Sequence, residues 1–322
     1  MDHPVDRSNL SPGALAQFTG SVLRLLSKPS DSLLTVRCIS RASALTVIGE
    51  AKSSIDSAER RRESASSLLR LLETSNILQP LALADAKPSS ALYAVGPFNA
   101  DTLDPVDLLM AAQPSGVVCY FSALQHYELT TQNPSHHHVA KLGTKVPSPT
   151  RVRQNASYPT SGGKGASVRS PFGTRLFSFQ SIPYYQTIRA IHTIAGIQQR
   201  QVSDRTIARI TTREQTLIDA LKRPLSCGGA SVVWEAWTTG LADIDEDRFV
   251  ATLVKLDDAH LMRRIGYMVQ ELEYRTGADL GNLIEKARQE VRRNPEIETV
   301  SLLPGLPVVR VDSAWRLQLP GR

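Results

Sequence analysis

The feature that most constrains this chain of 322 residues is a long tract without acidic side chains. From Leu129 to Ser203 there is no Asp and no Glu, although Lys and Arg recur. These cations must pair with acids from elsewhere in the fold, or they form a positive surface. Such a surface suits nucleic acid or an acidic partner, and the alternative is a solvated basic face on an ordinary domain. We expect on it Lys141, Lys145, Arg151, Arg153, Lys164, Arg169 and Arg175, and the tract also holds Arg189, Arg200, His192 and His136–His138.

Charge is unevenly distributed along the chain. Residues 101–230 carry 14 Lys and Arg against 7 Asp and Glu, a net charge of +7, whereas residues 231–322 carry 12 against 15, a net of −3. The positive middle and the negative end could neutralise each other in the fold or face two different partners. The length favours about two domains, and we place their boundary at Gly96–Asn99, giving domains 1–99 and 100–322.

Cysteine usage and hydropathy indicate the compartment. Cys38, Cys119 and Cys227 form no CxxC pair, which favours reduced, buried thiols. The N-terminus is polar and lacks an apolar signal segment, and no run approaches 18 apolar residues. We therefore expect a cytoplasmic protein without a membrane partner.

The first hundred residues contain a helix–hairpin pattern. Apolar residues from Leu15 to Leu26 at spacings of three and four predict one helix. A second helix, capped by Ser54 or Ser57, is expected to run to about Glu73 with Leu68, Leu69 and Leu72 in its stripe. Two strands, at 77–83 and 91–95, follow. This order is typical of a winged helix-turn-helix, and the alternative is a small structural helix-plus-hairpin domain.

Three arginines carry the DNA-binding prediction. Arg60, Arg61 and Arg62 would occupy the first turns of the second helix, and Lys87 lies in the hairpin loop. At about 100° per residue, Arg60 and Arg62 flank the apolar stripe and Arg61 lies over it, so at most two can face DNA. Which helix reads the base pairs stays open.

The remaining residues predict a mixed domain with a helical end. We expect a helix at 104–112, a turn or helix at 120–128, an ambiguous segment at 184–197, and a terminal strand in VVRVDSAWRLQL. Short strands are expected at 116–119, 138–141, 175–179 and 205–210, and helices from Thr211 or Thr212, and at 231–238, 246–254, 259–273 and 280–288. The fold class is therefore α+β: a winged helix-turn-helix, then a larger mixed α/β domain ending in a bundle-like helical half.

Three segments resemble the AbiEi-type antitoxin family, the regulator half of type IV abortive-infection toxin–antitoxin pairs. The first runs from Tyr120 to Thr130 and contains Ser122. The second is similar to the family's T-x-E-x-T-L-x-D-x-L-x-R-P-x-x-x-G-G, and the third to R-L-G-Y-L-L-E-x-L. The matching residues of these two segments are Thr212, Glu214, Thr216, Asp219, Arg223, Gly228 and Gly229, and then Arg264 and Gly266.

The resemblance covers about residues 120–272 and implies a function. Proteins of this family bind inverted repeats in their own promoter and repress it. Their C-terminal domain neutralises a co-encoded nucleotidyltransferase-like toxin, with or without direct contact. The partners implied here are thus double-stranded DNA and a cognate toxin, with no cofactor, no metal and no catalytic residue of the chain's own.

The same motif residues have plain structural interpretations. Thr212 and Glu214 could be helix capping alone, and Gly228-Gly229 a turn. Asp219 could form an ion pair with Arg223, four residues on. Gly266 would permit close packing by a neighbouring element. The motif could therefore mark the fold more than any chemistry.

Enzyme interpretations are weaker. Ser161–Gly165 lacks the hydroxyl residue of a phosphate-binding loop, and of His136–His138 only the outer two could share a metal. The acidic residues between Asp243 and Asp258 lie near expected helix starts, so we interpret them as helix caps rather than as ligands of a two-metal centre. The alternative function is a nuclease-like, nucleic-acid-processing enzyme that uses the 129–203 tract as a substrate channel.

Overall fold

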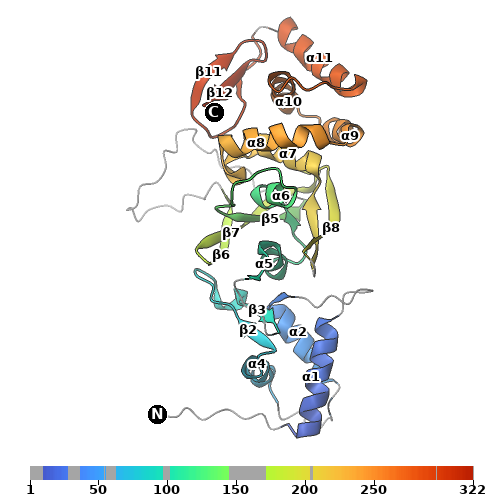
Figure 1. Cartoon of the computed structure of the whole chain (residues 1–322), viewed down its shortest axis with the longest axis vertical. Coiled ribbons are helices and arrows are strands. Elements are labelled where there is room, and N and C mark those ends of the chain that lie inside the picture. Colours follow the sequence, from blue (N-terminus) through green and yellow to red (C-terminus); the bar gives the residue numbers. More distant parts are fainter. Residues whose placement is uncertain are drawn as a thin grey trace, which may run out of the picture. The chain divides into compact units, whose positions relative to one another are not determined.

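The structure is a computed structural model, and it describes residues 10–27, 37–53, 55, 63–96, 102–144, 172–203, 206–294 and 296–321. Helices and strands are mixed along the chain (Figure 1), so the fold is of the expected α+β class. Contacts between residues divide the chain into two compact units. The first comprises Met1–Pro114, Leu176–Ser181 and Gln201–Ala208, and the second comprises Ser115–Arg175, Ile182–Arg200 and Arg209–Arg322.

The first unit contains helices packed on a small antiparallel sheet. Its elements are α1 (Pro12–Leu26), β1 (Cys38–Ser40), α2 (Arg41–Lys52), α4 (Ala65–Thr74), β2 (Leu78–Pro80), η1 (Pro88–Ser90), β3 (Leu92–Val95) and α5 (Pro105–Ala112). The strands are ordered β1-β3-β2, so β3 lies between the other two. Helix α5 packs against β1 and β3. The first unit therefore extends beyond residue 99, and the boundary of a separate DNA-binding domain stays a prediction.

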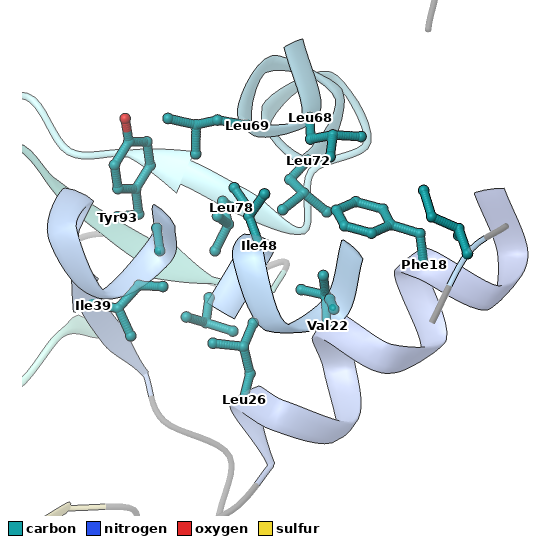
Figure 2. Packing of buried hydrophobic residues seen from close by; sticks show 14 of the residues in the cluster. Phe18, Val22, Leu26, Ile39, Ile48, Leu68, Leu69, Leu72, Leu78 and Tyr93 are labelled. Carbon is teal, nitrogen blue, oxygen red and sulfur yellow. The ribbon is translucent and has the colours of Figure 1, made fainter. Parts of the chain in front are cut away.

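The core of this unit is formed by apolar side chains that converge from three helices. Phe18 and Val22 of α1, Ile48 of α2 and Leu68 and Leu72 of α4 point toward one another (Figure 2). Each is completely or almost completely buried, and burial of such a side chain contributes about 1.5–3 kcal/mol. The predicted helices in 12–26 and up to about residue 73 are thus confirmed as core elements.

Two features of the first unit differ from the sequence predictions. Helix α2 was not predicted, because its buried positions are mostly small (Ala44, Ala51) and give a weak apolar stripe. The N-cap of α4 is Ser64 rather than Ser54 or Ser57. Its hydroxyl accepts the N–H of Ser67 at 3.0 Å, at the point where the leucine stripe begins.

A mixed six-stranded sheet, ordered β6-β7-β5-β4-β9-β8, occupies the middle of the described sequence. Its strands are β4 (Val117–Val118), β5 (His137–Gly143), β6 (Thr174–Phe179), β7 (Ile182–Ala190), β8 (Ile197–Ser203) and β9 (Thr206–Thr211). β5 runs parallel to β7, and β4 pairs antiparallel to β5 and parallel to β9. The segment 184–197, ambiguous in sequence, forms most of β7, the short helix η3 (Ile191–Thr193) and the start of β8.

The remaining helices lie in the order predicted, one between β4 and β5 and the others after β9. They are α6 (Phe121–His126) within the sheet region, then α7 (Arg213–Lys222), η4 (Pro224–Cys227), α8 (Ala230–Gly240), η5 (Leu241–Asp243), α9 (Glu246–Leu256), α10 (Ala259–Glu271) and α11 (Ala278–Arg293). A last small sheet joins β10 (Val300–Ser301), β12 (Leu317–Pro320) and β11 (Val308–Asp312). Trp237 of α8 donates its indole N–H to the carbonyl of Leu217 in α7 at 3.0 Å. Trp315, between β11 and β12, packs against α10.

Candidate functional site

The predicted DNA-contacting arginines fall outside the described residues. Arg60, Arg61 and Arg62 precede α4, so the prediction that they occupy its first turns is wrong. The helix cannot be extended back over them because Ser64 caps its free N–H groups and has extended backbone geometry, with φ −81° and ψ 155°. That these three arginines contact DNA stays a prediction.

Helix α4 presents one apolar and one polar face. Leu68, Leu69 and Leu72 are buried in the core. Ser66, Arg70 and Thr74, spaced by four residues, are exposed on the opposite side. The helix therefore offers a short hydrophilic stripe with a single guanidinium.

The loop between β2 and β3 carries Lys87 and is partly fixed. Ala84 and Ser178 exchange two backbone hydrogen bonds of 2.9 and 2.8 Å. Asp85, the next residue, has a positive φ of 61° and begins the return of the chain. Lys87 is exposed just before η1, as a backbone-contacting role would require. The loop is thus held at Ala84 by two hydrogen bonds, while the residues from Lys87 to Ser89 are exposed.

The described part of the basic tract holds both exposed and buried cations. Lys141 in β5 and Arg175 in β6 are exposed as predicted. Lys145, Arg151, Arg153, Lys164 and Arg169 lie outside the described residues. Arg189 is an exception, since it is buried and bound to a carboxylate.

The three consecutive histidines are buried rather than exposed. His136, His137 and His138 are 5%, 2% and 0% exposed. Burial lowers the pKa of all three, to about 4 for His137 and about 3 for His138. Repulsion from His136 lowers the pKa of His137 and His138 by a smaller amount. They are therefore neutral near pH 7 and add no charge to the tract.

The hydrogen bonds of these rings define their tautomers. Nε2 of His136 lies 3.1 Å from the carbonyl of Ser226, and Nε2 of His138 lies 3.2 Å from the carbonyl of Phe172. A carbonyl only accepts, so both Nε2 atoms carry the proton. Nδ1 of His138 is buried and has no hydrogen-bond partner among the described atoms. The His138 ring stacks instead on Tyr185, with centroids 5.5 Å apart.

A buried ion pair links the basic tract to the family-like motif. Arg189 of β7 donates to both carboxylate oxygens of Asp219 in α7, over 2.5 and 2.8 Å. Gln215 adds a third hydrogen bond to Asp219 at 2.8 Å. Burial opposes the charge on Arg189, but the attraction of Asp219 prevails and holds the pKa of the guanidinium above its usual value. The predicted pair between Asp219 and Arg223 is therefore wrong; Arg223 ends α7 and is exposed.

Tyr120 supports this pair from the first motif segment. It follows β4 and begins α6 with a positive φ of 57°, which is rare for an aromatic residue. Its ring is 2% exposed and lies under the guanidinium of Arg189, whose Cζ is 5.3 Å from the ring centroid. Ser122, two residues on, accepts the backbone N–H of His138 at 3.0 Å. These residues join β4, β5, β7 and α7 in one packed centre.

The remaining motif residues of α7 cap its N-terminus or form hydrogen bonds to neighbouring segments. The Thr212 hydroxyl accepts the N–H of Gln215 at 3.3 Å, which confirms the capping interpretation for Thr212 but not for Glu214. Glu214 accepts the N–H of Asp245, at 3.3 Å. Thr216 is hydrogen-bonded to Thr211 and to the carbonyl of Thr212, both at 2.8 Å. Thr212, Glu214, Thr216 and Asp219 are thus engaged in internal contacts, whereas Arg223 is exposed.

The motif glycines fill positions that a side chain could not occupy. Gly228 (φ 97°) and Gly229 (φ 98°) form the predicted turn after η4, and the Phe121 ring lies where a Cβ on Gly228 would project. Gly266 of α10 packs against the ring of Trp315, so the expected close approach is confirmed. The neighbouring Arg264 donates to the carbonyl of Ser301 at 2.9 Å.

Arg263 was not among the predicted site residues, although it neighbours the motif residue Arg264. Arg263 is 2% exposed, and its Nε donates a hydrogen bond to the backbone carbonyl of Trp315 at 3.1 Å. Its Nη2 donates to the backbone carbonyls of Glu298 and Arg316. The only sequence signal was its position on the apolar side of α10, two residues before Ile265. It ties α10 to the last sheet.

The acidic third of the chain contributes caps. Asp245 accepts the N–H of Arg248 at 3.0 Å and begins α9, and Asp258 accepts the N–H of Leu261 at 3.0 Å and begins α10. The capping interpretation of these two acids is confirmed. Among the described residues, no three His, Cys, Asp or Glu side chains are grouped so that they could hold a metal ion. No helix in any of the described ranges is long and apolar enough to cross a bilayer.

The chain was compared with known proteins. No family model and no curated protein matches it. Among solved structures, it is similar to the RV2827C protein from Mycobacterium tuberculosis, with 12% sequence identity and a TM-score of 0.49 over 94% of this chain and 91% of that chain. A likeness at this level carries no conclusion about fold, activity or partners.

Proposed function

We propose that this protein is a DNA-binding transcriptional regulator and the antitoxin of a toxin–antitoxin pair. The first unit would act as a winged helix-turn-helix on double-stranded DNA in its own promoter. The second would neutralise a nucleotidyltransferase-like toxin. Promoter inverted repeats and the toxin class come from the AbiEi resemblance of the 120–272 segment.

One observation carries the DNA-binding half of the proposal. The first unit has the order α1-β1-α2-α4-β2-β3, and its three strands are arranged β1-β3-β2. Helix pairs that bind DNA place the second helix in the major groove, and a hairpin beside it contacts the flanking backbone. The β2–β3 loop, with exposed Lys87, supplies such a hairpin.

The antitoxin half is supported by how the motif residues gather. Tyr120 and Asp219, far apart in sequence, meet around Arg189 in a buried centre, and Ser122 is hydrogen-bonded to the backbone of His138 on β5. Buried motif residues of this kind stabilise the fold, and the toxin would bind surface residues that the fold holds in place. Exposed Lys141 and Arg175 are cations through which an acidic face of a toxin, or its nucleic-acid substrate, would be held.

The test is co-expression with the product of the neighbouring gene. We expect that product to arrest growth, the full chain to restore it, and a reporter driven by the chain's own promoter to be repressed. If the chain neither restores growth nor represses the reporter, the proposal is wrong. Incubation of the pure chain with DNA and RNA plus Mg²⁺ or Mn²⁺ tests the nuclease alternative: metal-dependent cleavage lost on replacing Asp245 and Asp247 would favour that function instead.

A further inference from the structure

We infer that two copies of this chain associate through strand β11, which pairs antiparallel with β11 of the second copy about a two-fold axis at Val311. This inference goes beyond the proposed function and does not depend on DNA or toxin binding. It rests on three properties of β11: an open hydrogen-bonding edge, exposed valines, and a charge pattern that complements itself.

Strand β11 lies at the edge of the last small sheet. The strand order is β10-β12-β11, so β12 covers one side of β11 (Figure 1). No strand in the described part of the chain pairs with the other side. An edge strand of this kind presents backbone N–H and C=O groups with which another chain can pair.

The backbone of Val311 is directed to this open side. The carbonyl of Gln318 in β12 accepts the N–H of Leu302 at 2.9 Å, so the hydrogen-bonding groups of Gln318 face the β10 side. Val311 lies opposite Gln318 in the antiparallel pair of β11 and β12. Opposite residues in such a pair exchange either two hydrogen bonds or none. Because Gln318 faces β10, Val311 exchanges none with it, and its N–H and C=O point to the open edge.

The exposed side chains of β11 are mostly apolar. Val308, Val309 and Val311 are 48%, 71% and 60% exposed. Edge strands are commonly protected from pairing by Lys, Pro or a bulge. Here the register shift lies between Val308 and Arg310, so the stretch from Arg310 to Asp312 is regular. That stretch can therefore accept a second strand, and β-branched valines favour such pairing.

The two charges on β11 determine the register of the pair. Arg310 and Asp312 are two residues apart and therefore lie on the same face of the strand. With Val311 opposite Val311 of the second copy, each Arg310 lies opposite an Asp312, which gives two ion pairs. Centring the pair on Arg310 or on Asp312 would instead place like charges directly opposite each other, which is destabilising.

Both charges are available for this contact. Arg310 is exposed, and its Nη2 lies 3.5 Å from the hydroxyl of Tyr267. Asp312 accepts the N–H of Trp315 with Oδ1 at 2.7 Å, which leaves its second carboxylate oxygen. Neither charge forms an ion pair with a described residue. In the proposed pair they occupy a non-hydrogen-bonded position, where opposite Cα atoms are about 4.5 Å apart and side chains are closest.

Sedimentation of the full chain over a wide range of concentration tests the association. The contact is short, so we expect a reversible equilibrium of monomer and dimer that depends on concentration. Val311→Lys would place two ammonium groups side by side at the axis and should leave only monomer. Val254→Lys on α9 is the matched control, because Val254 is 61% exposed, and it should dimerise like the wild type. Circular dichroism establishes that each variant is folded.

Cysteine variants test the register. Val311→Cys would bring two residues together at the axis with Cα atoms about 5.5 Å apart, a separation that a disulfide spans. In Val309→Cys the two Cα atoms would be offset by four residues along the strand, which is more than about 10 Å. The three native cysteines are buried. We therefore expect mild oxidation to cross-link Val311→Cys into a dimer and to leave Val309→Cys monomeric.

The inference is overturned if the wild type stays monomeric at every concentration, or if Val311→Lys dimerises as well as the wild type. Cross-linking of Val309→Cys in preference to Val311→Cys would contradict the register centred on Val311. None of these results depends on DNA binding, so this inference and the proposed function succeed or fail separately.

Discussion

Arg189 and Asp219 form a two-pronged ion pair between strand β7 and helix α7, with donor–acceptor distances of 2.5 and 2.8 Å. Asp219 is 1% exposed and Arg189 9%. The acid-free tract therefore obtains a counter-charge from the motif helix downstream. Because both groups are buried, each is needed to offset the desolvation of the other.

Removing one member of this pair should strongly destabilise the fold. Asp219→Ala leaves a buried guanidinium without its carboxylate, and we expect a loss of about 3–5 kcal/mol in unfolding free energy, measured by urea denaturation. Asp243→Ala is the control, since it breaks the more exposed ion pair with Arg213 and should cost less than about 1 kcal/mol. Equal losses in the two variants would contradict the structural role of the buried pair.

Stability should fall on mild acidification because of the histidine cluster. His137 and His138 have pKa values of about 4 and 3 in the folded protein against 6.5 for an ordinary histidine. Their contribution is complete above pH 6.5. Below it the unfolded chain binds protons that the folded chain does not, so stability is lost as the pH falls toward 4–3, by up to about 1.4 kcal/mol per pH unit for each histidine.

Unfolding free energies at pH 7.5, 6 and 5 check this prediction. His138→Gln should flatten the pH dependence, whereas His260→Gln, at an exposed position on α10, should leave it unchanged. A slope that is the same in all three proteins would contradict the assignment of the acid sensitivity to the buried ring.

Replacing Gly266 with Ala should destabilise the helical half. The added methyl group would collide with the ring of Trp315, and overpacking of this kind costs about 1–3 kcal/mol. Gly20→Ala on α1 is the control: its Cβ meets no atom within 4 Å, so a gain of up to about 1 kcal/mol is expected. Thermal melting measures both, and a Gly266→Ala protein as stable as the wild type would refute the close approach.

Charge reversal in the basic tract should impair neutralisation. In the full chain, Arg151→Glu, Arg153→Glu and Lys164→Glu together would repel an acidic partner, while Lys255→Glu on α9 serves as the control. Growth rescue against the neighbouring gene product is the measurement. If the triple variant is folded and rescues as well as the control, the tract is a solvated face. The full chain is preferable to residues 101–322, because truncation at residue 100 would remove β1 and β3 from α5.

Local sequence signals predicted much of the fold. Regular apolar spacing located α1 and α10, and the hydroxyl of Thr212 located the start of α7. Gly266 indicated the packing against Trp315 correctly. Helix periodicity and capping depend on residues close to one another in the sequence, so the sequence alone reveals them.

Contacts between distant segments could not be predicted. The partner of Asp219 was expected four residues away, yet Arg189 is brought to it by the position of β7 in the sheet. Burial of His136–His138 likewise depends on rings from distant segments, among them Phe121, Phe172 and Tyr185. The small side chains of α2 hid that helix because its core contacts are made by Ala44 and Ala51 around a single isoleucine. Such contacts follow from topology, not from local pattern.

The most direct test of the account is the salt dependence of DNA binding by the full chain. Fluorescence anisotropy with a duplex from its own promoter would compare the wild type, Arg60→Ala/Arg62→Ala, and Arg293→Ala on α11 as control. We expect salt-sensitive binding by the wild type and the control. The double variant should bind more weakly, and the slope of log affinity against log salt concentration should be reduced by about one unit for each lost phosphate contact. Unchanged affinity and slope in the folded double variant would contradict the arginine assignment, and no binding by the wild type would contradict DNA recognition altogether.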